Sequence, residues 1–157
     1  TVLPFLTLQY LYGLARARRP EADTLLECVR VYAQTAPPFV REVWRSVALP
    51  ACEGLHAYAR GDFDSAWRGL SATRARMAET GGSHAQRDLF EQLLLDATIK
   101  SGRLSAAQQM LELRRMRDPN GVPVNAALAD VYSRLGLSSL ASQSEARAGA
   151  TLLRHSA

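Results

Sequence analysis

A glycine followed five residues later by an alanine recurs in this chain and limits the folds that it can adopt. Three copies fall where turns between helices are expected: Gly61 and Ala66, Gly102 and Ala107, Gly136 and Ala141. The second and third glycines are 34 residues apart, and the first and second are 41 apart. Glycine readily adopts the left-handed conformation that ends a helix, and a small alanine lets the next helix approach closely. The spacing therefore predicts repeated pairs of antiparallel helices.

Apolar residues recur at intervals of three and four along almost the whole chain, as in Leu3, Leu6, Tyr10 and Leu14. This is the period of an amphipathic helix, and no segment shows the alternation of a β-strand. Pro50 falls inside a helical pattern, where it either kinks the helix or starts a new one. We expect seven to nine helices, separated near residues 19–20, 36–38, 49–50, 61–62, 81–83, 102–103, 118–122 and 136–137. Asp62 is expected to cap the helix that follows it.

The interval of 34 residues is the period of the tetratricopeptide repeat. The sequence thus predicts an all-α fold, in which tetratricopeptide-like antiparallel helical pairs are stacked as a short right-handed α-solenoid. We expect a single helical-repeat domain over residues 1–157. Residues 1–49 would form irregular leading helices, and residues 50–82, 83–119 and 120–157 would form three repeats. The seven extra residues of the longer interval fall at residues 81–88.

Residues 81–88, with the sequence GGSHAQRD, gather five different types of polar residue between two expected helices. Gly81 and Gly82 end one helix, and Ser83 and Gln86 have the spacing of a capping box that starts the next. They would form a structural joint, which leaves His84, Arg87 and Asp88 without an assigned role. A structural interpretation pairs Arg87 and Asp88 with neighbouring repeats. A binding interpretation places an anion at the helix N-terminus beside Arg87, and a catalytic one would pair Ser83 with His84. The catalytic one lacks an orienting third group, so we assign no catalytic residue.

Composition excludes several classes of function. The apolar content of 47% suits a folded domain, and no run approaches the roughly 18 apolar residues of a membrane span. The net charge is +4, but the arginines alternate with carboxylates instead of forming a basic stripe, which argues against nucleic-acid binding. Cys28 and Cys52 lack metal-site spacing, and we expect buried, reduced thiols in a cytoplasmic protein. We expect no metal and no cofactor, and we interpret His56 as a packed or partly exposed side chain.

Residues 81–88, followed by Phe90, Leu93 and Ala97, resemble the hallmark stretch of the tetratricopeptide repeat protein 38 family. The preceding segments Leu49-Pro50 and Ala57-Tyr58-Ala59-Arg60-Gly61-Asp62-Phe63, with Ala66, are similar to its pattern as well. The resemblance covers residues 40–119 well and the flanks loosely, and residues 122–157 do not follow the family pattern. It implies a helical-repeat fold and a C-terminal piece of a longer protein, and it carries no biochemical activity.

The favoured function is a non-enzymatic scaffold that binds a protein or peptide in a concave groove lined by the first helix of each pair. Candidate binding residues are outward positions of two such helices, together with the unassigned residues of the joint: Gln86, Gln92, Asp96, Asn125, Asp130, His84, Arg87 and Asp88. Tyr58, Trp44, Trp67 and Tyr132 are expected in the core, and any that lined the groove would be an anchor for a peptide. The alternative is a small-ligand protein or enzyme with a carboxylate or phosphate site at the joint. A third candidate function is self-association.

Overall fold

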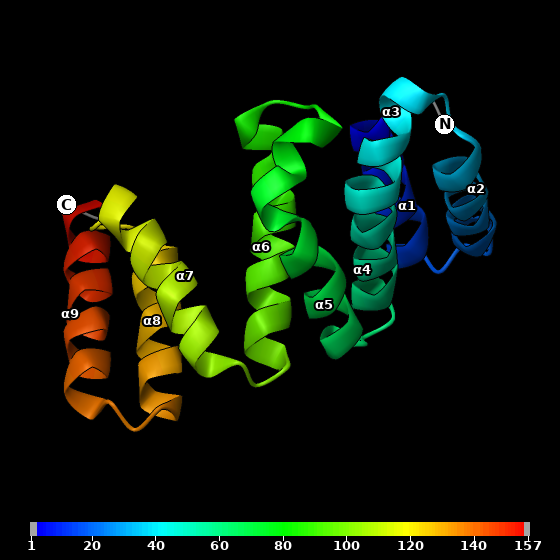
Figure 1. Cartoon of the computed structure of the whole chain (residues 1–157). Coiled ribbons are helices and arrows are strands. Elements are labelled where there is room, and N and C mark those ends of the chain that lie inside the picture. The colour runs from blue at the N-terminus through cyan, green and yellow to red at the C-terminus, as the bar shows by residue number, and fades with distance from the viewer. Residues whose placement is uncertain (1–2, 156–157) are drawn as a thin grey trace. The chain divides into compact units, whose positions relative to one another are not determined.

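A computed structural model describes residues 3–155, which form helices and turns and contain no β-strand. Figure 1 shows the helices in chain order. Their bounds are α1 Pro4–Arg16, α2 Glu21–Thr35, α3 Pro38–Val43, the π-helical turn η1 Trp44–Ala48, α4 Leu49–Ala59, α5 Phe63–Thr73, the 3₁₀ segment η2 Arg74–Thr80, α6 His84–Lys100, α7 Leu104–Arg117, α8 Val122–Arg134 and α9 Ser138–His155. The prediction of an all-α chain is confirmed. Within this range no helix combines the length and the apolar character that crossing a bilayer requires.

The contacts divide the chain into two compact units, one ending at Ala97 and the other beginning at Thr98. The division falls inside α6, within the predicted repeat 83–119. In the first unit, α1, α2 and α4 bury Leu8, Val29 and Leu55 completely. In the second unit, α8 packs against both α7 and α9, and Leu128 and Val131 of α8 are fully buried. Each unit therefore has a hydrophobic core of its own.

Three helices end in the same turn, and each turn contains one of the repeated glycines. The glycines have positive φ angles of 83° at Gly61, 76° at Gly102 and 76° at Gly136. In each turn the glycine N–H donates to the carbonyl three residues before it, and the next residue donates to the carbonyl five residues before itself at 2.8–3.0 Å. This pair of hydrogen bonds defines the Schellman motif. The glycine spacing in the sequence thus marks repeated helix ends, as predicted.

The close approach of α4 and α5 depends on glycines from both helices. A Cβ atom added to Gly69 would lie 2.5 Å from the carbonyl oxygen of Pro50 and 2.9 Å from Cα of Gly54. A Cβ atom added to Gly54 would lie 3.1 Å from the carbonyl oxygen of Ala66, which is fully buried. The expectation that Ala66 lies where two helices meet closely is therefore confirmed for this pair. Gly54 and Gly69 shorten the distance between the two helices further, because no side chain stands between the backbones at these positions.

Of the two alternatives considered from the sequence for Pro50, the start of a new helix is confirmed, because α4 begins at Leu49 with Pro50 in its first turn. The helical backbone runs from α3 through η1 into α4, and Pro50 lies in the first turn of α4. The Leu49 N–H donates to the carbonyl of Trp44, five residues before it. Proline has no N–H to donate, and its ring clashes with the carbonyl four residues earlier in a regular α-helix. The wider π turn accommodates the proline while the chain stays helical.

The helix that follows Asp62 is shorter than the sequence predicted. It ends at Thr73 and gives way to the tighter η2, which reaches Gly81. The Thr73 hydroxyl donates to the carbonyls of Gly69 and Leu70 at 3.3 and 3.1 Å. Such a bond competes with the regular ladder of the helix. The N-terminus agrees with the prediction, because Asp62 Oδ1 accepts a 3.0 Å hydrogen bond from the Ser65 N–H and caps α5.

Candidate functional site

The capping box predicted at residues 81–88 is present. The Gln86 N–H donates to Ser83 Oγ at 3.2 Å, and the Ser83 N–H donates to Gln86 Oε1 at 2.8 Å. Each residue thereby accepts a hydrogen bond from the backbone N–H of the other at the start of α6. Both are exposed, and their polar groups are already used, so they hold the joint and leave little for a ligand to bind.

The two glycines of the joint fix it against α1. Gly81 and Gly82 have φ angles of 92° and 72°. A Cβ atom added to Gly82 would lie 2.6 Å from the ring of Phe5. Phe5 in turn contacts Phe90 of α6 edge to face, with 5.9 Å between the ring centroids. The joint therefore packs on an aromatic pair of the first unit, and glycine is required at position 82 for both its conformation and its contact.

Arg87 and Asp88 make hydrogen bonds with residues that are near them in the chain. The Arg87 guanidinium donates to the carbonyl oxygens of Gly81, at 3.1 Å, and of Gly82. Asp88 Oδ2 accepts a 2.6 Å hydrogen bond from Gln92, one turn further along α6. Arg87 thus stabilises the end of η2 instead of presenting its charge to an anion beside the amides of α6. His84 is exposed at the first position of the helix.

The candidate groove residues differ in their surroundings, and one of them was placed wrongly. Asn125 is fully buried, and its amide donates to the carbonyls of Pro119 and Gly121 at 3.0 and 2.9 Å. It secures the loop before α8 and is not on an outward face. Asp130 lies 3.4 Å from Arg134 in an exposed ion pair, and Gln92 is exposed. The sequence could not identify the buried position, because asparagine is usually a surface residue.

A cluster of two tyrosines and one carboxylate joins three helices of the first unit. The Tyr58 hydroxyl of α4 donates to Asp96 Oδ2 of α6 at 2.6 Å. The ring centroid of Tyr12, from α1, lies 6.2 Å from that of Tyr58. All three side chains are half-buried. We call these three residues the tyrosine–aspartate cluster. Asp96 was a candidate from the sequence, whereas Tyr58 was expected in the core, as Trp44 and Tyr132 prove to be.

A pocket of about 540 Å³ opens between the α1–α2 turn and the C-terminal end of α4, within the first unit. We call it the α1–α2 pocket. It is lined by Ala15, Arg18, Arg19, Pro20, Ala22, Asp23, His56, Ala59 and Arg60. Its charged or titratable lining side chains are one carboxylate, one imidazole and three guanidiniums.

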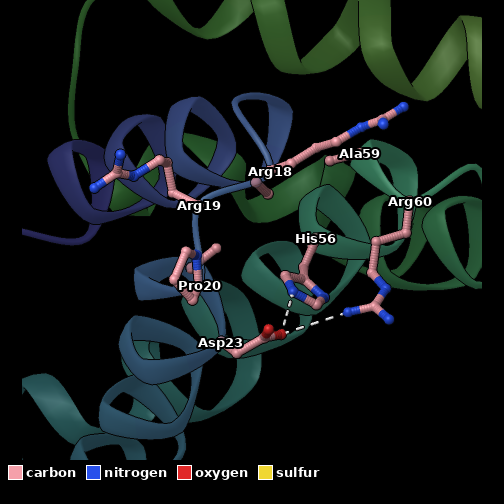
Figure 2. A pocket seen from close by; sticks show the side chains of 9 residues that line it. Arg18, Arg19, Pro20, Asp23, His56, Ala59 and Arg60 are labelled. Carbon is pink, nitrogen blue, oxygen red and sulfur yellow. Dashed lines mark ion pairs between the residues drawn. The ribbon is translucent and has the colours of Figure 1, made fainter.

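One carboxylate organises the polar side of the α1–α2 pocket. Asp23 Oδ1 lies 2.9 Å from Nε2 of His56 and 3.5 Å from Nη1 of Arg60. Figure 2 shows the Asp23 carboxylate facing these two side chains of α4, while Arg19 points away from them. Arg19 forms a two-pronged contact with Glu21, at 2.9 and 3.2 Å. This contact and the backbone lower the pKa of Glu21.

Sequence reasoning missed the α1–α2 pocket. His56 was interpreted as a packed or partly exposed side chain, and it is indeed mostly covered, with 14% of its side chain exposed. Its partner Asp23 lies on another helix, and no local spacing relates the two residues. A signal was nevertheless available at Arg18, because this helix end carries an arginine where three others carry glycine.

The two cysteines differ in a way that the sequence did not predict. Cys52 is buried, as expected, and burial raises the pKa of its thiol to about 12. Cys28 is exposed on α2, so the expectation that it is buried was wrong. Neither cysteine forms a disulfide. Among the residues that the structure describes, no three histidine, cysteine or acidic side chains are grouped as metal ligands would be.

The sequence matches no protein-family profile, and no solved structure matches the chain.

Proposed function

We propose that this chain is a non-enzymatic helical-repeat scaffold that binds a segment of a partner protein. The resemblance to the tetratricopeptide repeat protein 38 family supports the proposal, as do the helix ends built in one geometry around Gly61, Gly102 and Gly136. Arrays of helical pairs commonly serve as binding surfaces. The two thiols without a disulfide suit a cytoplasmic protein.

The tyrosine–aspartate cluster is the observation that carries the proposal. Three helices of the first unit contribute to it, and the 2.6 Å hydrogen bond from Tyr58 to Asp96 fixes its geometry. Burial and the neighbouring Asp96 raise the pKa of the Tyr58 hydroxyl, so this group remains a neutral donor at physiological pH. Half-buried tyrosines present both an apolar ring and a polar end, which makes them effective anchors at interfaces.

The chemistry of the cluster favours a basic side chain of the partner. The faces of tyrosine rings attract cations, and a carboxylate next to them adds a favourable charge. A lysine or arginine flanked by apolar residues is therefore the partner segment that fits best. Leu89 and Gln92, exposed on the same helix as Asp96, would contact the residues that flank it.

The test uses Asp96→Asn, which removes the charge and retains an oxygen to accept the Tyr58 hydrogen bond. Fluorescence anisotropy would compare peptides that carry one lysine or arginine among apolar residues with the same peptides carrying glutamate. The wild-type chain should prefer the basic peptides, and Asp96→Asn should bind them about tenfold more weakly, as expected for the loss of about 1.4 kcal/mol. Glu145→Gln, which removes an exposed carboxylate from α9, should bind as the wild type does.

Two results would contradict this function. One is a wild-type chain that binds basic and acidic peptides equally or binds neither. The other is an equal loss of affinity in Asp96→Asn and Glu145→Gln, which would reveal a general charge effect. Thermal melts of both variants must match the wild type, so that a change in affinity is not a change in folding.

A further inference from the structure

Arg18 occupies a position that is glycine at three other helix ends. Its N–H donates to the carbonyl of Ala15, and the N–H of Arg19 donates to that of Leu14, both at 3.0 Å. This is the same Schellman motif that contains Gly61, Gly102 and Gly136. The φ angle of Arg18 is 53°, and among residues 3–155 no other non-glycine residue has a positive φ.

The conformation of Arg18 is unfavourable for any residue with a side chain. In the left-handed region the Cβ atom crowds the backbone, and glycine avoids this strain. Glycine would therefore serve the turn better than arginine does. Strained residues that persist tend to lie at functional sites. Arg18 lines the α1–α2 pocket. We therefore attribute a function in this pocket to its charged side chain.

The charges around the α1–α2 pocket leave the Arg18 guanidinium without a counterion. Three arginines and one aspartate line the pocket. Arg19 is neutralised by Glu21, and Arg60 shares Asp23 with His56. Arg18 is exposed and forms no ion pair within the described part of the chain. The pocket therefore carries an excess of positive charge, and a cationic pocket attracts anions.

We propose that the α1–α2 pocket binds the phosphate group of a small ligand, with the guanidiniums of Arg18 and Arg60 as donors. The Arg18 side chain points away from Arg60 in Figure 2, and it turns toward the pocket when the phosphate binds. Guanidinium groups match phosphate oxygens with paired hydrogen bonds. A phosphate monoester has three terminal oxygens to accept from the two guanidiniums, and it carries about −1.5 to −2 charges at neutral pH. Asp23 positions Arg60, because the oxygen that lies beside His56 Nε2 also contacts Arg60.

The size of the pocket supports a small molecule as the source of the phosphate. Its volume of about 540 Å³ lies within the roughly 300–1,000 Å³ of ordinary ligand pockets. The lining residues other than the charged ones and His56 are three alanines and a proline, which would contact the body of the ligand. This site is separate from the tyrosine–aspartate cluster and does not depend on the function proposed for it.

The experiment is a titration of the ¹⁵N-labelled chain, followed by NMR at constant ionic strength. The probes are inorganic phosphate, adenosine monophosphate, a phosphoserine peptide and acetate. Phosphate and adenosine monophosphate should shift the amide resonances of the α1–α2 turn, and acetate at the same concentrations should not. Absence of a shift with phosphate, or an equal shift with acetate, overturns the proposal. Tighter binding of the phosphoserine peptide than of adenosine monophosphate overturns the small-molecule source.

Two variants locate the site. Arg18→Gly removes a donor and suits the turn, so the variant will fold, and it should bind phosphate about tenfold more weakly or worse. Arg147→Ala removes an exposed arginine of α9 and should bind as the wild type does. Equal binding by Arg18→Gly and the wild type excludes Arg18 as a ligand-binding residue. An equal loss of phosphate affinity in both variants shows that only the net charge of the chain matters, and it overturns the proposed binding site as well.

Discussion

Replacement of Gly69 by alanine is expected to destabilise the first unit, although alanine is the better helix former. In a helix interior alanine is favoured over glycine by about 1 kcal/mol. At this position, however, the new Cβ atom would lie 2.5 Å from the carbonyl oxygen of Pro50 and 2.9 Å from N and Cα of Gly54. These are backbone atoms that cannot rotate away, so α4 and α5 must move apart. Overpacking of this kind costs about 1–3 kcal/mol, and more when a backbone must shift. We expect a net loss of about 1–2 kcal/mol in the free energy of unfolding.

The assay is urea denaturation followed by tryptophan fluorescence, which reports on this unit because Trp44 and Trp67 both belong to it. Gly13→Ala is the matched control, since no atom lies within 4 Å of a Cβ added there in α1. It should stabilise the chain by up to about 1 kcal/mol. Gly54→Ala should fall between the two, because its Cβ would meet its nearest neighbours at 3.0 Å. A Gly69→Ala variant as stable as Gly13→Ala would refute the close approach of α4 and α5.

Three further predictions concern the joint, the cap of α5 and the cysteines. Ser83→Ala should lower the free energy of unfolding by about 1 kcal/mol in urea, while Ser83→Asp should retain the cap; equal effects of the two would dismiss the capping box. Hydrogen bonds from Ser65 lower the pKa of Asp62 in the folded chain. The Asp62 carboxylate therefore stabilises the fold fully above pH 3.8, its ordinary pKa, and this stabilisation is lost as the pH falls through the lower pKa of the folded state. Acid titrations of Asp62→Asn should show a weaker loss of stability than the wild type, and an unchanged profile would contradict this. Ellman's reagent should react quickly with Cys28 and only slowly with Cys52, whose thiol is buried; two fast thiols would show that Cys52 is accessible.

The parts of the fold that depend on neighbouring residues in the sequence could be predicted. The glycines that end helices, the Ser83–Gln86 capping box and the Asp62 cap were all identified correctly. Each of these is a hydrogen-bonding pattern completed within about six residues, so the sequence contains both partners at a recognisable spacing. The same locality explains why the all-α architecture was evident from the apolar period.

The features that depend on distant residues could not be predicted. The π turn before Pro50 and the 3₁₀ segment after Thr73 are two of several ways to continue a helical pattern, and packing selects among them. The α1–α2 pocket needs two helices to bring Asp23 to His56. A helix end with arginine in place of glycine was the signal available in the sequence.

The central claim is that arginine stands at position 18, where the turn would suit glycine, because its charge binds phosphate. Thermal melts of the wild type and Arg18→Gly, with and without phosphate, test this claim most directly. Without phosphate, Arg18→Gly should be the more stable by about 1 kcal/mol, which corresponds to roughly 2–4 °C for a chain of this size. Phosphate should raise the melting temperature of the wild type, because a ligand stabilises the state that it binds, and at the same concentration it should raise that of Arg18→Gly much less. A variant that melts below the wild type, or that gains as much from phosphate, would contradict the account.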